Sequence, residues 1–212
     1  MAAARSDPGR FALFGASGSG KTFMLNRLIY NDRRVIGFDP QASMQGRCFE
    51  DRASFLRAIM AARGGGFKLI YRAPRGSDRE AELAWLANFV LNFQEGYRRG
   101  RGGAPLTFAI DEMSVCYPNV PGRPSSHPMT EMCNMGRHYG VKLIGATQRP
   151  AEIGSTFRGN VSCTYVFRLE NDIDVDRVRK IIGLKDGGEL KSLGVGEHLR
   201  FEKGKIYRVK RK

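Results

Sequence analysis

The sequence predicts an α/β fold in which a mostly parallel central sheet is flanked by helices. Short apolar or β-branched runs alternate with segments of helical periodicity, which is typical of parallel strands joined by crossover helices. The first run, 11–14, leads through a glycine-rich loop into a helix-like segment at 23–30. A later run, 106–110, is followed directly by two acidic residues. We expect one domain over the 212 residues, with a core at about 10–170 and a basic extension at about 171–212.

Seven segments of the chain are predicted to be strands. Six are runs of β-branched, aromatic or other apolar residues bounded by polar or turn-forming ones. These runs are 11–14, 35–38, 68–71, 106–110, 141–145 and 163–169. The seventh is an edge strand in the tail 203–212, where Ile206, Tyr207 and Val209 are interleaved with six basic residues.

The clearest predicted helix follows Ser77, because Ser77 and Glu80 fit the capping box S-x-x-E. Apolar residues then recur at spacings of three and four, which places them on one helical face, and we assign them to core packing. They are Leu83, Leu86, Val90, Phe93 and Tyr97, widened by Trp85 and Phe89. Another helix is predicted at 129–139. Two loops stand out, the basic loop 98–103 and the proline-rich loop 117–128, and a long loop inside a compact domain is often functional.

The composition indicates a polyanionic partner. Lys and Arg number 35 against 21 Asp and Glu, a net charge of +14, which favours nucleic acid over a merely soluble basic surface. No apolar run approaches the ~18 residues of a membrane span, and residues 1–10 lack the apolar region of a signal peptide. The scattered cysteines and histidines predict reduced intracellular thiols and no zinc site. They are Cys48, Cys116, Cys133, Cys163, His127, His138 and His198.

An eight-residue run fits the phosphate-binding loop pattern G-x-x-x-x-G-K-[ST] at every fixed position. It reads Gly15-Ala16-Ser17-Gly18-Ser19-Gly20-Lys21-Thr22. Its small residues let backbone N–H groups surround phosphate oxygens, while Lys21 supplies a positive charge and the Thr22 hydroxyl a ligand for Mg²⁺. Apolar runs on both sides argue against a flexible Gly/Ser linker. The sequence therefore predicts a P-loop NTPase that binds a nucleotide's phosphates with this run.

Two further patterns suggest hydrolysis. Asp111 and Glu112 end an apolar strand in the form of a Walker B motif, in which Asp111 would hold Mg²⁺ through water and Glu112 would polarise the attacking water. The pair favours ATP hydrolysis over phosphoryl transfer to a small acceptor. Gln148 follows the strand at 141–145, where its amide can hydrogen-bond the γ-phosphate or the water. The alternative is that Gln148 is only a polar residue where the strand passes into a loop, which Pro150 then marks.

With these motifs in place, the chain resembles the FtsK/HerA superfamily of DNA-pumping ATPases. The resemblance runs from about 11 to 169 and includes Phe38-Asp39-Pro40, Ile110-Asp111-Glu112 and Gly136-Arg137-His138-Tyr139-Gly140. Its most discriminating part is Thr147-Gln148-Arg149-Pro150 after an apolar strand. It implies a RecA-like core, Lys21 and Thr22 as the Walker A pair, Gln148 as the sensor, and a ring, hexamer or pentamer, around DNA.

The resemblance also implies a role for Arg137, which matches the position of an arginine supplied to the neighbouring subunit's nucleotide. Such an arginine finger neutralises charge on the γ-phosphate and can be worth ~10³-fold or more in rate. The alternative is a solvated arginine at a helix end. Four other arginines compete for the role: Arg72, Arg75, Arg149 and Arg158.

The size of the chain narrows the expectation. We expect no membrane anchor and no appended DNA-reading domain, so the chain looks most like the minimal genome-packaging ATPases of internal-membrane-containing viruses. Double-stranded DNA is the expected partner, contacted at its phosphates by 98–101 and Arg123, with a virion vertex or membrane protein as a further partner. The expected location is the host cytoplasm, the virion, or both.

Four other functions are alternatives to this interpretation. A phage assembly or secretion ATPase of the zonula-occludens-toxin kind has similar motifs but usually carries a membrane span. A P-loop kinase for a nucleotide or another small molecule needs a lid and an acceptor pocket, and would not explain 147–150. A regulatory GTPase would carry the motif N-K-x-D, which the sequence lacks. A DNA-binding protein without enzymatic activity would explain the charge but not the combined motifs.

Overall fold

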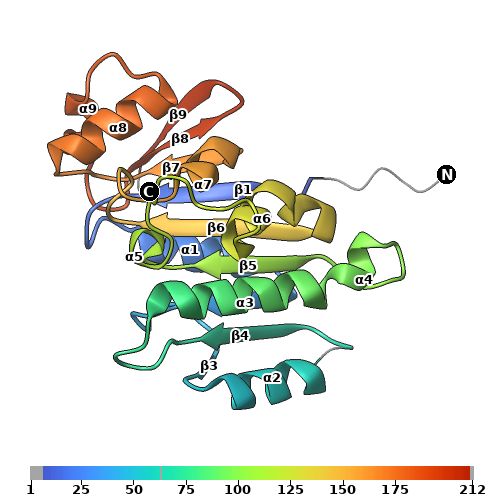
Figure 1. Ribbon diagram of the computed structural model, residues 1–212. Helices are drawn as coiled ribbons and strands as arrows, with labels where there is room; N and C mark the ends of the chain where they lie inside the picture. Colours follow the sequence, from blue (N-terminus) through green and yellow to red (C-terminus); the bar gives the residue numbers. More distant parts are fainter. Residues whose placement is uncertain (1–6, 63, 211–212) are drawn as a thin grey trace.

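The computed structural model describes residues 7–62 and 64–210, which build a nine-stranded sheet covered by helices on both faces (Figure 1). The strand order is β3-β4-β2-β5-β6-β1-β7-β8-β9. Strands β1 to β7 run parallel, whereas β8 and β9 are antiparallel additions at one end. The predicted mostly parallel α/β sheet is confirmed. Two terminal stretches lie outside the described residues. They are 1–6, part of the segment predicted not to be a signal peptide, and 211–212, the end of the predicted basic tail.

All seven predicted strands are present. The strands are β1 Arg10–Phe14, β2 Arg34–Phe38, β3 Arg47–Phe49, β4 Phe67–Tyr71, β5 Leu106–Ile110, β6 Val141–Thr147, β7 Cys163–Val166, β8 His198–Glu202 and β9 Lys205–Val209. Strand β7 stops short of the predicted end at Leu169. Strands β3 and β8 were not predicted, because β3 has only three residues and β8 mixes apolar with charged residues at the sheet's antiparallel end.

The helices connect these strands. They are α1 Lys21–Ile29, α2 Arg52–Ala61, α3 Arg79–Phe93, α4 Glu95–Arg98, α5 Met113–Cys116, α6 Pro128–Met135, the 3₁₀ helix η1 Gly136–Tyr139, α7 Ser155–Asn160, α8 Asp172–Ile182 and α9 Gly188–Ser192. The helix predicted at 129–139 is thus α6 followed by η1, which ends at Gly140 with φ 69°, a conformation that suits glycine. Tyr97 belongs to α4 rather than to the long helix α3.

The predicted capping box at Ser77 is wrong by one residue. Helix α3 begins after Asp78, whose carboxylate accepts the backbone N–H groups of Glu80 at 2.9 Å and Ala81 at 3.1 Å. The Ser77 hydroxyl instead donates to the carbonyl of Pro74 at 2.8 Å within the preceding turn. Both residue types are good N-caps, so the sequence alone does not separate them.

The core lies on both faces of the sheet. Alternate β1 residues point to opposite faces, so Ala12 and Phe14 join one buried cluster and Leu13 joins the other. Helix α1 covers the face of Leu13, and helices α2, α3 and α6 pack on the other (Figure 1). The core assignment of Trp85 and Phe89 is confirmed, since both pack against the larger cluster.

The C-terminal segment continues the same structure. Strands β8 and β9 extend the sheet beyond β7, and Leu190, Leu193 and Leu199 are buried in the larger core cluster. Helices α8 and α9 precede these strands along the chain and pack against each other. Among the described helices, none has both the length and the apolar character needed to cross a lipid bilayer.

Candidate active site

The glycine-rich loop lies where the carboxyl ends of three neighbouring strands meet. It leaves β1 after Phe14 and enters α1 at Lys21. The Gly15 N–H donates to Thr147 at the end of β6, at 3.3 Å, and the Ala16 N–H donates to Arg168 just after β7, at 2.7 Å. These bonds fix the start of the loop at the carboxyl ends of the strands, where open α/β proteins bind ligands.

Two of the motif's fixed glycines have a structural reason. A Cβ at Gly15 would lie 2.6 Å from the Cβ of Phe167 and 2.7 Å from the Ser19 hydroxyl oxygen, so a side chain does not fit there. Gly20, directly before α1, has φ 113°, which only glycine adopts without strain. The loop therefore depends on these two glycines to bring its backbone to the N-terminus of α1, where N–H groups favour anions.

Lys21 is folded over this loop. Its ammonium Nζ donates to the carbonyl of Ala16 at 2.9 Å, and the side chain is largely buried. Burial lowers the pKa of Lys21, while the nearby carboxylates of Glu112 and Asp111 act to raise it. The Lys21 ammonium thus lies near both the loop and the acidic pair.

Asp111 lies directly after β5 in a shared acidic network. Its carboxylate accepts the Ser43 hydroxyl at 2.5 Å and the Glu112 N–H at 3.0 Å. Asp39, at the end of β2, accepts the backbone N–H groups of Ser43 at 2.6 Å and Met44 at 2.7 Å. Burial raises the pKa of Asp111 above its usual value, and the charge of Asp39 adds to this.

Asp39 and Ser43 are site residues for which the sequence predicted no role. The triplet Phe38-Asp39-Pro40 was part of the family resemblance, so an acid at the end of β2 was visible in the sequence. Ser43 carried no such signal, because only the folded turn after β2 brings its hydroxyl to Asp111.

Glu112 and Gln148 face each other. Strand β6 lies between β1 and β5, so its end places Gln148 between the loop and the acidic pair. The Gln148 amide Nε2 donates to the Glu112 carboxylate at 2.6 Å. Glu112 has φ 48° and ψ 47°, a left-handed conformation that is uncommon outside glycine and clusters at functional sites. This turn directs a buried carboxylate toward Gln148 instead of continuing the strand.

The oxygen atoms of the site fit a magnesium ion. The Asp111 and Asp39 carboxylates and the Ser43 hydroxyl are joined in one network, and Thr22 adds a hydroxyl in the first turn of α1. Mg²⁺ prefers oxygen ligands and is usually held by one or two carboxylates together with phosphates and water. Among the described residues no group of three His, Cys, Asp or Glu side chains is arranged to hold a metal ion alone, so this ion would depend on nucleotide oxygens.

Arg137 is not part of this cluster. It is exposed on η1, just before β6, whereas Gln148 follows that strand. The seven residues of β6 separate the two ends by roughly 20 Å at about 3.3 Å per residue. A catalytic role for Arg137 therefore requires the nucleotide of another subunit.

Three of the four competing arginines are engaged within the chain. Arg149 forms ion pairs with Asp174 at 3.4 Å and Glu152 at 3.7 Å, and Arg72 pairs with Glu50 at 3.2 Å. The Arg158 guanidinium donates to carbonyls of the segment 150–153. Arg75 is exposed in the turn after β4.

The fold is similar to those of several solved ATPase structures. The genome packaging NTPase B204 from Sulfolobus turreted icosahedral virus 2, in complex with AMPPCP, superposes with a TM-score of 0.72 at 16% identity over 97% of this chain and 98% of that one. VirB4 of Thermoanaerobacter pseudethanolicus gives 0.70 at 11% identity over 96% and 89%. The chain therefore shares the overall fold of these solved structures.

A third structure, EssC (ATPases 2 and 3) from Geobacillus thermodenitrificans, gives a TM-score of 0.60 at 12% identity over 95% of this chain and 39% of that one. No protein-family model matches the sequence, and no curated protein is similar to it. At these identities the likeness concerns the P-loop ATPase fold itself. The roles of individual residues have to be argued from the site.

Proposed function

We propose that the protein is an ATP-hydrolysing double-stranded DNA translocase that packages a viral genome. The observation that carries the hydrolysis step is the contact between Gln148 and Glu112 beside the phosphate loop. A phosphate loop alone binds a nucleotide. A carboxylate held by an amide next to that loop adds a group that accepts a proton from water and one that orients it.

Different groups of the chain bind the phosphates and activate the attacking water. The backbone of 15–20 and the N-terminus of α1 bind the phosphate oxygens, and Lys21 offsets their negative charge. Thr22 and Asp111 would hold a Mg²⁺ ion, which would supply positive charge beside the phosphates. Glu112 accepts the proton of the attacking water, and Gln148 holds that water or the γ-phosphate in line.

Two observations support DNA as the partner. The net charge of +14 favours a polyanion that is contacted at its phosphates without sequence specificity. A similar structure is named as the genome packaging NTPase of a virus. A homo-oligomeric ring, hexamer or pentamer, would place DNA in its channel, with a virion vertex or membrane protein as the docking partner. The protein would then act in the host cytoplasm, the virion, or both.

The test is ATP hydrolysis measured with and without duplex DNA over a salt series. We expect duplex DNA to raise the ATPase rate, and we expect the DNA concentration for half-maximal stimulation to rise steeply between roughly 50 and 200 mM salt, because phosphate contacts release counterions. Hydrolysis without DNA is the control for a general effect of salt on the enzyme. Stimulation that does not depend on salt would contradict a phosphate-based partner, and no stimulation at all would contradict DNA as the partner.

A further inference from the structure

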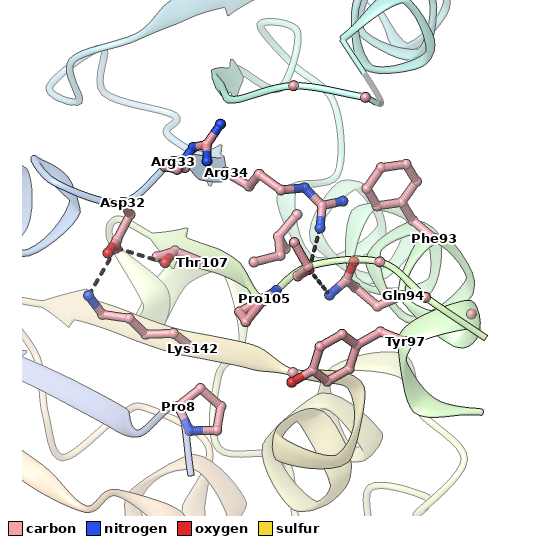
Figure 2. A pocket seen from close by; sticks show the side chains of 18 of the residues that line it. Pro8, Asp32, Arg33, Arg34, Phe93, Gln94, Tyr97, Pro105, Thr107 and Lys142 are labelled. Atoms are coloured by element: carbon pink, nitrogen blue, oxygen red, sulfur yellow. Dashed lines mark hydrogen bonds and ion pairs between the residues drawn. The ribbon is translucent and has the colours of Figure 1, made fainter. Parts of the chain in front are cut away.

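A cavity of about 870 Å³ lies at the amino ends of the parallel strands, whereas the phosphate loop follows the carboxyl end of β1. Figure 2 shows side chains that line this cavity. Its walls come from segments that precede strands or form the first residues of strands. They are 31–34 before and in β2, 64–65 before β4, 101–107 leading into β5, and 140–142 at β6. The lining is completed by residues around the end of α3 and in α4 and by one residue before β1: Phe93, Gln94, Gly96, Tyr97 and Pro8. The proposed catalytic residues Glu112 and Gln148, at the carboxyl ends of the strands, do not line this cavity.

The walls of this cavity are held by a hydrogen-bonded network. The Asp32 carboxylate accepts the Thr107 hydroxyl at 2.7 Å and the Lys142 ammonium at 2.9 Å, so one cation of the lining is neutralised. The Gln94 amide donates to the carbonyls of Ala104 at 3.1 Å and Tyr139 at 3.0 Å. Figure 2 shows Arg34 directed at the same carbonyl of Ala104. These contacts tie together segments of the lining that are distant in the sequence.

Two guanidinium groups of the lining are left for a ligand. Arg33 and Arg101 are exposed, and neither forms an ion pair with any residue that the structure describes. The single carboxylate of the lining, Asp32, is used by Lys142. The lining thus carries a net positive charge, and its two outward cations come from separate segments of the chain. Such an arrangement attracts an anion.

The ion pairs of the basic residues also narrow the set of arginines that we expect to contact DNA. Arg98 and Arg99 are each 2.6 Å from the carboxylate of Glu95, which offsets one of their two positive charges. Arg123 is mostly buried, pairs with Glu80 and lies over the ring of Tyr117. In the basic loop 98–103, Arg101 remains as the cation without a carboxylate partner among the described residues.

The rims of the cavity favour a polymer backbone over a small enclosed anion. Gly64, Gly65, Gly102 and Gly103 are exposed, and no side chain projects from them to close the cavity. Small-molecule pockets bury most of their ligand, whereas phosphate contacts to nucleic acid come from cations on an open surface. We propose that this cavity, through Arg33 and Arg101, binds the phosphodiester backbone of duplex DNA.

The position of the cavity separates this DNA site from the ATP site. The first residues of β5 and β6 line the cavity, with Leu106 and Thr107 from β5 and Lys142 from β6. At their other ends, β5 stops at Ile110, two residues before Glu112, and β6 stops at Thr147, one residue before Gln148. Within one subunit, DNA bound at the cavity and ATP bound at the phosphate loop would therefore occupy opposite ends of β5 and β6. The inference rests on the proposed function, because it assigns the site for that function's DNA partner.

The experiment is a comparison of two double charge reversals. The cavity variant is Arg33→Glu with Arg101→Glu. The matched control is Arg57→Glu with Arg177→Glu, which changes the net charge equally at exposed arginines on α2 and α8 that do not line the cavity and form no ion pair with a described residue. Binding of a short fluorescent DNA duplex is measured by anisotropy over a salt series. Melting temperature and basal ATPase activity check that both variants fold.

We expect the cavity variant to bind the duplex about 10-fold more weakly than the control, with a log-affinity against log-salt slope shallower by about 2, one for each lost phosphate contact. Equal affinities of the two variants would overturn the assignment. So would a wild-type protein that binds inorganic tripolyphosphate through these arginines but not the duplex.

The outcomes also separate this inference from the proposed function. If duplex DNA stimulates ATP hydrolysis of the cavity variant and of the control equally, the cavity assignment fails and the DNA-dependent ATPase stands. If duplex DNA neither binds nor stimulates the wild-type protein, both fail together.

Discussion

Glu112→Gln is expected to lower the rate of ATP hydrolysis by about 10²- to 10⁴-fold, the usual contribution of a general base, while ATP binding persists. Glutamine keeps the shape of the side chain and an oxygen that accepts the Gln148 amide, so the contact between the two residues survives. It removes the negative charge and the basic oxygen that accepts a proton from water. The binding groups at Gly15, Lys21 and Thr22 are untouched.

The measurement for Glu112→Gln combines phosphate release with titration of a fluorescent ATP analogue. Glu152→Gln is the control, because it makes the same change in an exposed carboxylate that pairs with Arg149 close to the site. We expect that variant to hydrolyse ATP at nearly the wild-type rate. Unchanged turnover in Glu112→Gln would remove Glu112 from the reaction, and loss of ATP binding would show that the residue holds the nucleotide instead.

The second large effect is expected from Arg137→Ala, with a loss of roughly 10³-fold or more in hydrolysis if the residue acts as an arginine finger. Because Arg137 lies at the opposite end of β6 from Gln148, its effect has to occur at a neighbour's nucleotide. Lys21→Ala should also be inactive, for loss of the phosphate-binding charge. Mixing the two inactive proteins should restore activity, since some interfaces then pair an intact loop with an intact Arg137.

The mixing experiment is read as ATPase rate against the ratio of the two variants at constant total protein. A maximum at intermediate ratios is the expected result. Arg177→Ala, at an exposed arginine on α8, is the control for a general loss of positive charge and should stay active by itself. A mixture no more active than its components would contradict a role for Arg137 in trans.

The parts of the site that are contiguous in sequence could be predicted from it. The loop 15–22 has a fixed spacing, and Asp111 and Glu112 directly follow an apolar run, so both motifs carry their own structural context. Gln148 was also predictable from its position after a buried strand. The structure adds what local patterns do not contain, namely that β6 lies between β1 and β5 and so brings these three segments together.

Features made by distant segments could not be predicted. The bond from Ser43 to Asp111 joins two turns that only the pairing of β2 with β5 makes neighbours. The cavity at the amino ends of the strands is built from six stretches of chain, and Arg33 and Arg101 both line it without belonging to any shared motif. The choice between Ser77 and Asp78 as a helix cap depended on a turn at Pro74. Each is set by tertiary contacts.

The proposed function requires that ATP hydrolysis drives movement along duplex DNA. It is tested most directly by displacement of a third-strand oligonucleotide from a DNA duplex, followed by fluorescence in the presence of ATP and Mg²⁺. We predict displacement by the wild-type protein that requires hydrolysable ATP and is abolished in Glu112→Gln. Displacement that proceeds equally with a non-hydrolysable analogue, or none at all by a protein whose ATPase activity DNA stimulates, would contradict the claim.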